Sequence, residues 1–145
     1  MLGRESRSET LGLGGGNIRV EMKAVLGVCL GGAIGACLRY GILLAFQRTD
    51  ARFPYATLSA NALGCLVAGA VWFLIAEREF LSPQWRAFLV TGLLGALTTF
   101  STFGVDTYLL WLGGNRQMAV LVILANLLLG LGAVALGWRV AASLA

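Results

Sequence analysis

The sequence has 145 residues, of which 58% are hydrophobic and 12% charged, and its mean hydropathy is +0.81. Because soluble domains carry roughly a quarter charged residues, this composition excludes a soluble globular domain of this size. The net charge of +4 does not indicate nucleic-acid binding, since the basic residues lie at the ends of apolar runs, where they fit lipid headgroups. With no histidine, and with all three cysteines inside apolar runs, the usual zinc and iron sites are excluded as well.

Residues 1–22 are predicted to be a flexible extension. They are polar and then glycine-rich, and they contain no apolar core of the length that a signal peptide needs. Residues 23–145 are predicted to form the membrane domain, with apolar spans at 24–46, 55–76, 84–112 and 118–140. Since about 20 helical residues cross a bilayer, the predicted fold class is an all-α integral membrane protein with four transmembrane helices.

Small residues recur at every fourth position in the first two spans, at Gly27, Gly31 and Gly35 and then at Ala60, Gly64 and Ala68. This spacing places them on one helix face and predicts the close approach of another backbone. Asn61 lies within the second set, and Asn126 is a polar residue inside the fourth span. Each is either an interhelical hydrogen-bonding residue or a functional amide, and the pattern favours neither.

The third span is interrupted. Ser82 and Pro83 predict its first helical turn, and its apolar first part ends at residue 97. Residues 98–103 are then polar and aromatic, with three threonines, a serine and two phenylalanines. Such a cluster can unwind a helix, and unwound backbone at membrane depth must be satisfied by protein or by a water-filled cavity. The sequence therefore predicts a broken third helix and a candidate ion site at the break.

The residue types at the interruption suit a small anion. The donors are neutral hydroxyls and amides, and Phe100 and Phe103 share a helix face because they are three residues apart. The edge of an aromatic ring carries positive potential, and weak serial sites of this kind suit conduction. Backbone carbonyls at the break would instead favour a cation. Helix packing is an equal alternative, in which the hydroxyls bond back to the helix and the rings fill the core.

The basic residues near the spans are almost evenly divided between the two sides of the membrane. One side has five, Arg19, Lys23, Arg78, Arg86 and Arg139, and the other has four, Arg39, Arg48, Arg52 and Arg116. Because the bias of basic residues sets membrane orientation, this chain has little orientation preference. Two copies inserted in opposite directions would pair as an antiparallel dimer, and one weakly specified orientation is the alternative.

Three segments resemble the motifs of the CrcB/Fluc fluoride channels. They are GGAIGACLRY at 31–40, TLSANALG at 57–64 and GALTTFSTF at 95–103, and they occur in the family's order. The four-span layout matches over residues 24–142. The resemblance implies a passive, fluoride-selective ion channel, which is not an enzyme and which exports fluoride across the cell inner membrane to relieve toxicity. It also implies an antiparallel, dual-topology homodimer with two pores and a structural Na⁺ at the dimer interface.

The resemblance also implies roles for particular residues. Phe100 and Phe103 would be pore rings, with pore amides and hydroxyls from Asn61, Asn126, Ser101, Thr102 and Thr57. Arg39 would stand at a vestibule, and the backbone carbonyls of Gly95 and Thr98 would bind the Na⁺. Asn126 stands where the family often has serine. Val122 stands where the family often has tyrosine, and it is not expected to be a site residue.

A small proton-coupled multidrug exporter is the rival function, since such proteins also have four spans. That mechanism needs a membrane-buried carboxylate. The first two spans contain none, and Asp106 lies near the end of the third, where a solvated or arginine-paired carboxylate is expected.

Overall fold

The computed structural model describes residues 15–47, 53–79 and 81–145, which form helices and turns and contain no strand. The elements in chain order are α1 (Gly15–Phe46), α2 (Tyr55–Ala76), α3 (Pro83–Arg86), the π-helix η1 (Ala87–Leu94), α4 (Gly95–Leu97), α5 (Phe100–Leu112) and α6 (Arg116–Leu144). Four stretches of the described residues are long and apolar enough to cross a membrane, namely Glu21–Phe46, Tyr55–Ala76, Pro83–Leu112 and Arg116–Leu144. The prediction of an all-helical chain with four spans is confirmed, and this is the architecture of a multi-pass membrane protein.

Helix α1 begins before the predicted start of the membrane domain. It starts at Gly15, so the last part of the predicted flexible extension is helical in the structure. The rest of that extension, residues 1–14, lies outside the described residues. The boundary at residue 23 stays a prediction.

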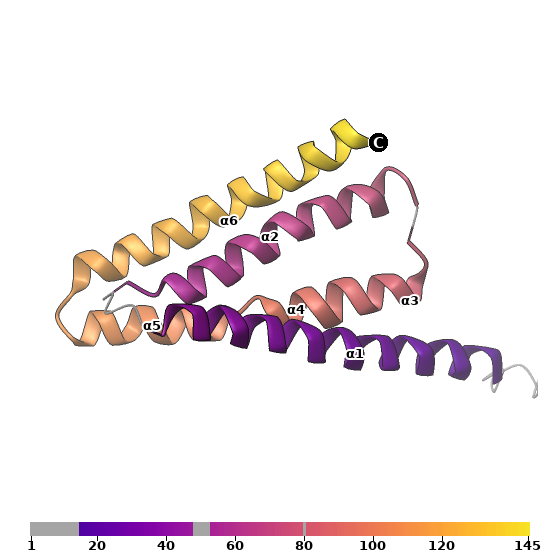
Figure 1. The fold of residues 1–145 in the computed structure, drawn as a ribbon, viewed down its shortest axis with the longest axis horizontal. Coiled ribbons are helices and arrows are strands. Elements are labelled where there is room, and N and C mark those ends of the chain that lie inside the picture. The colour runs from indigo at the N-terminus through magenta and orange to yellow at the C-terminus, as the bar shows by residue number, and fades with distance from the viewer. Residues whose placement is uncertain (1–14, 48–52, 80) are drawn as a thin grey trace, which may run out of the picture.

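The four spans pack as two pairs. Helix α2 lies along α6, and α1 lies along η1 and α4. Figure 1 shows that α1 starts and α6 ends at the same end of the bundle, as an even number of spans requires. Much of the outer surface is apolar, including Leu128 and Leu131 of α6, which are 67% and 71% exposed. A surface of this kind suits lipid rather than water.

The predicted small-residue faces do permit close backbone approach. Gly31 and Gly35 of α1 are buried against η1, and a Cβ atom at either position would collide with the backbone carbonyl of Phe88 or Leu93. On α2, Gly64 is buried against the side chain of Thr98. The glycines of α1 and α2 therefore enclose the first half of the third span and the residue at which it is interrupted.

A second close contact joins α2 to α6, and the spacing in the sequence did not predict it. Gly69 of α2 lies against the carbonyl of Val134, and Gly137 of α6 lies against the carbonyl of Leu66. Both glycines are buried, and each leaves room for the backbone of the other helix. The two helices therefore pack backbone to backbone along this seam.

The third span begins as predicted. Ser82 caps α3, with its side chain accepting a hydrogen bond from the Trp85 N–H at 3.5 Å, and Pro83 occupies the first turn. The span continues as the π-helix η1 and then α4, which ends at Leu97. Thr98 and Thr99 have extended backbone, with φ/ψ of −81°/154° and −149°/112°. Helix α5 then starts at Phe100.

Candidate functional site

The interruption at Thr98 and Thr99 is held by side-chain hydrogen bonds. Thr99 caps α5, because its Oγ1 accepts from the Thr102 N–H at 3.1 Å. The same hydroxyl lies 3.2 Å from Ser101 Oγ and 3.0 Å from Thr102 Oγ1. The Thr98 hydroxyl instead donates back to the Leu94 carbonyl at 2.9 Å. The threonines thus cap the helices on either side, as the packing alternative expected, and also form a cluster of neutral hydroxyls.

Asn61 of α2 binds the backbone of this interruption. Its Oδ1 accepts from the Thr99 N–H at 2.8 Å, and its Nδ2 donates to the Thr99 carbonyl at 3.3 Å. Because Thr99 is buried and its extended backbone cannot form regular helical bonds there, the amide satisfies both of its polar backbone groups. Asn61 is therefore an interhelical hydrogen-bonding residue in the described chain.

Asn126 of α6 joins the same network. The Asn61 Nδ2 also donates to the Asn126 Oδ1 at 3.0 Å, while the Asn126 Nδ2 donates to the Val122 carbonyl at 3.0 Å. Val122 itself is fully buried. The second, third and fourth spans thus meet at one hydrogen-bond network, formed by the two asparagine side chains and the Thr99 backbone. The two asparagines singled out in the sequence are in direct contact.

Phe100 and Phe103 lie together on α5. Their ring centroids are 5.5 Å apart, and the ring planes are inclined by 58°. Phe100 is 83% exposed and Phe103 is half-buried, with the exposed Ser101 and Thr102 beside them. An exposed aromatic ring next to hydroxyls offers positively polarised ring edges and neutral donors on one surface. The Phe100 ring thus does not fill the core of the described chain.

Arg39 lies at a cavity of about 310 Å³ between α1, α2 and the start of α5. The cavity is also lined by Tyr40, Thr57, Thr99 and Thr102. The guanidinium of a half-buried arginine is a permanent positive charge, and hydroxyls from two other elements line the same cavity. This arrangement can attract a small anion toward the interruption.

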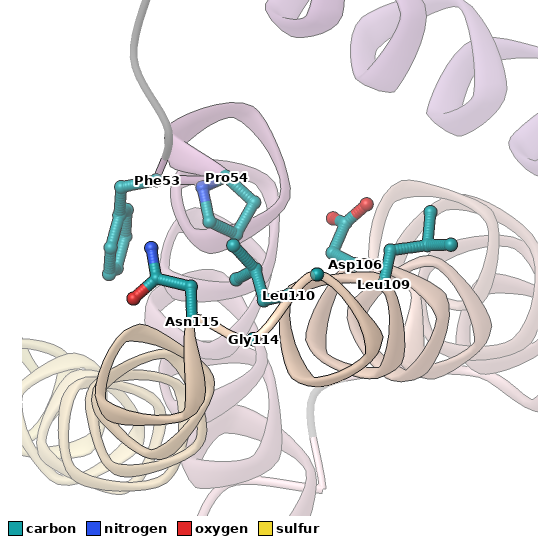
Figure 2. Close-up of a pocket in the computed structure, with 8 residues that line it drawn as sticks. Phe53, Pro54, Asp106, Leu109, Leu110, Gly114 and Asn115 are labelled. Atoms are coloured by element: carbon teal, nitrogen blue, oxygen red, sulfur yellow. The ribbon is translucent and has the colours of Figure 1, made fainter.

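Thr57 connects this cavity to a wider pocket of about 700 Å³ at the end of α5. Its Oγ1 donates a hydrogen bond of 2.7 Å to Oδ2 of Asp106, which lines the second pocket. Figure 2 shows Asp106 and Leu109 on one side of this pocket and Phe53 and Asn115 on the other. The described partner of Asp106 is thus a threonine hydroxyl, where the sequence suggested solvent or an arginine. The two side chains are 49 positions apart, and no spacing rule predicts their contact.

Gly95 and Thr98, the predicted cation-binding residues, have carbonyls that lose their regular helical partners. In an α-helix the N–H of residue 99 would bond the carbonyl of residue 95, and that of residue 102 would bond residue 98. Here the Thr99 N–H donates to Asn61, and the Thr102 N–H donates to the Thr99 hydroxyl. Gly95 is also exposed. Carbonyl oxygens released from a helix are the ligands that a hard cation prefers, so these two residues fit such an ion.

Comparison with known proteins places these features in one family. The family model described as CrcB-like protein, Camphor Resistance (CrcB), matches residues 26–138. A protein of Shewanella amazonensis named fluoride-specific ion channel FluC is 47% identical over 117 residues, which cover 80% of this chain and 94% of that protein. A protein of the same name from Chloroflexus aurantiacus is also 47% identical, and one from Saccharophagus degradans is 42% identical over 109 residues, 75% of this chain and 82% of its own length.

The residues that the family model matches, 26–138, reach into all four spans and include the positions of the interruption, of both asparagines and of both phenylalanines. The matches also confirm the resemblance that the three sequence motifs indicated. The chain belongs to the family of CrcB-like proteins, whose curated relatives are named as fluoride-specific ion channels.

Proposed function

We propose that this protein is a passive, fluoride-selective ion channel. The observation that carries the proposal is the 47% identity over nearly the whole length of relatives named fluoride-specific ion channels. A channel is a transport protein and not an enzyme. The four spans and the polar groups at membrane depth in the third span support a transport function.

The path that we propose for fluoride runs along the start of α5. The ring edges of Phe100 and Phe103 and the hydroxyls of Ser101 and Thr102 would surround the ion's path together, because these four consecutive residues form the first turn of α5. Thr57 extends the row of hydroxyls toward the wider pocket, and Asn61 and Asn126 complete its polar wall. These groups are neutral, so each binds the ion weakly enough to release it to the next.

We further propose that two copies of the chain form an antiparallel homodimer with two pores. Phe100 is 83% exposed on a helix that crosses the membrane, beside exposed hydroxyls that lipid cannot satisfy. A second copy would cover this surface and complete the wall of the path. The near-equal distribution of basic residues supports insertion in both orientations.

We propose that a structural Na⁺ lies where the two copies meet, bound by the carbonyls of Gly95 and Thr98 from both. The loss of their regular helical partners supports this assignment. The ion would coordinate carbonyl oxygens that are costly to leave without a partner in a bilayer. It would thereby hold the two interruptions against each other. Arg39 would attract anions into a vestibule.

The direction of transport follows from the chemistry of fluoride. HF is a neutral weak acid that crosses a membrane and dissociates in the less acidic cytoplasm, which traps the anion. A passive pore in the cell inner membrane lets fluoride leave down its own gradient and relieves its toxicity. No coupling ion and no membrane-buried proton carrier are needed.

The test is fluoride efflux from liposomes that contain the purified protein. We expect a large fluoride flux, a negligible chloride flux and no dependence on an imposed proton gradient. If the folded, reconstituted protein gives no fluoride flux, the channel proposal is refuted. A flux of cationic drug that depends on a proton gradient would identify the multidrug exporter instead.

A further inference from the structure

The interruption of the third span depends on a competition for one backbone N–H group. A continuous α-helix would direct the Thr99 N–H to the carbonyl of Gly95. In the structure this N–H donates to the Asn61 Oδ1 at 2.8 Å, so a side chain of α2 replaces the helical acceptor. The Asn61 oxygen must therefore face Thr99 for the interruption to persist.

The orientation of the Asn61 amide also depends on a contact with α6. A carboxamide has one acceptor oxygen and two N–H donors, and rotation by half a turn about its last bond would exchange them. Exchange would set the Asn61 N–H₂ group against the Thr99 N–H, with two donors facing each other. Two acceptors of the Asn61 Nδ2 oppose this exchange, the Thr99 carbonyl at 3.3 Å and the Asn126 Oδ1 at 3.0 Å, and the shorter of the two bonds comes from α6.

Asn126 is itself oriented by its own helix. Its Nδ2 donates to the Val122 carbonyl at 3.0 Å, four residues earlier on α6, so only its oxygen faces α2. The hydrogen bonds therefore run in one direction, from Thr99 through Asn61 and Asn126 to the Val122 carbonyl. Hydrogen bonds aligned in this way polarise and strengthen one another.

We propose that Asn126 is a positioning residue that keeps the third span interrupted by fixing the orientation of Asn61. Besides its place in the polar wall of the proposed path, it acts through Asn61, because both ends of its amide are engaged within the protein. The effect on transport rests on the proposed function. The effect on the backbone of Thr98 and Thr99 does not, and it is measured separately.

The test uses nuclear magnetic resonance of the full chain in detergent micelles or nanodiscs, with threonine and asparagine labelled. In the unmodified protein we expect the Thr99 amide proton to show the low-field shift and the slow solvent exchange of an amide that donates to the Asn61 oxygen. We also expect Thr98 and Thr99 carbon shifts of extended backbone. Asn126→Leu removes the acceptor and keeps the number and branching of the side-chain heavy atoms, so the Thr99 amide and carbon shifts should move and fluoride flux should fall about tenfold.

Two further variants separate positioning from packing. Asn126→Asp keeps an oxygen facing Asn61, so the Thr99 signals should stay close to those of the unmodified protein even where the added charge lowers anion flux. Leu128→Ala, at a neighbouring position that is 67% exposed, should change neither the signals nor the flux.

Unchanged Thr99 signals in Asn126→Leu would overturn the proposal, whatever the flux. Should that variant fail to fold, a Thr99 amide proton with the shift and exchange rate of an unbonded amide in the unmodified protein, or displaced Thr99 signals in Asn126→Asp, would overturn it as well. Absence of fluoride flux in the unmodified protein with these signals as expected would refute the channel and leave the role of Asn126 intact.

Discussion

The two halves of the third span have opposite surroundings. Residues 87–97, in η1 and α4, are enclosed by the glycine faces of α1 and α2, so that Leu94 and Leu97 are buried. Helix α5 buries none of its residues, and it carries the rings and hydroxyls of the candidate site. Since both halves belong to one apolar span, hydropathy alone does not distinguish them. The first half is specialised for packing within the chain, and the second half presents groups that need a partner or an ion.

The largest expected effect tests the packed half. The substitution Gly35→Val sets a branched side chain against the Leu93 carbonyl, which cannot move without displacing η1. We expect it to cost about 3 kcal/mol or more, at or above the upper end of typical overpacking penalties, and to leave little folded protein. The measurement is the yield of monodisperse protein in detergent, followed by thermal unfolding. Gly32→Val is the matched control, because nothing lies within 4 Å of a Cβ atom at Gly32. Equal yields and equal unfolding temperatures of the two variants would show that close packing against α1 does not stabilise the first half of the third span.

The next effect tests the exposed half. Phe100→Ile and Phe103→Ile keep apolar bulk but remove the polarised ring edge, whose contact with the ion we set equal to that of an aromatic pair, about 0.5–1.5 kcal/mol. We expect fluoride flux to fall up to about tenfold for each variant, since 1.4 kcal/mol corresponds to a factor of ten. The elution volume of the protein should not change. Leu112→Ile, on the same helix and at a position 62% exposed, is the control. Wild-type flux in both phenylalanine variants would mean that the path lies elsewhere.

A smaller effect is expected from a change in membrane orientation. Lysines added after Ala145 increase the basic charge on one side of the membrane, and the near-even distribution makes orientation sensitive to such a change. We expect two or three lysines to bias insertion and to lower flux a few-fold by depleting antiparallel pairs. Cysteine labelling from each side measures the orientation, and added glutamines serve as the control. A single fixed orientation of the unmodified chain would contradict the antiparallel dimer.

The smallest effect concerns the link between the two pockets. Thr57→Val removes the donor to the half-buried Asp106 carboxylate, and hydrogen bonds to charged groups contribute about 1.5–3 kcal/mol. Because this carboxylate is half-exposed and water can replace the lost donor, we expect a loss of stability below that range, of about 0.5 kcal/mol, measured by thermal unfolding. Thr107→Val is the control, since its hydroxyl bonds only the Phe103 carbonyl of its own helix. If the control loses as much stability as Thr57→Val, the contact with Asp106 has no special role.

Features set by local pattern were predictable from the sequence. Long apolar runs predicted the four spans, the spacing of Gly31 and Gly35 predicted the close approach of another backbone, which is η1 in the structure, and Ser82 with Pro83 predicted the start of α3. Each of these depends on residues that are neighbours in the chain or on one helix face. The polar residues at 98–102 also identified where the candidate site lies.

The pairing of polar groups was not predictable. Asn61 bonds residues 38 and 65 positions away, and its pattern did not distinguish a packing role from a functional one. The π-helical path of η1 had no local signal either, since its residues would equally form an α-helix. Such features depend on which helices become neighbours, and the sequence alone did not settle this.

Helix α1 has more length than the bilayer requires. Its 32 residues extend about 48 Å at 1.5 Å each, whereas the hydrocarbon core of a bilayer is about 30 Å thick. The glycine face anchors the middle of α1 to η1, and the span that is apolar enough to cross the membrane is Glu21–Phe46, so the excess lies at the Gly15 end. A membrane of different thickness would then change how much of that end enters the lipid, without shifting the helix against the interrupted span. The protein would thus adjust to hydrophobic mismatch at the Gly15 end of α1, and the candidate site would stay unchanged.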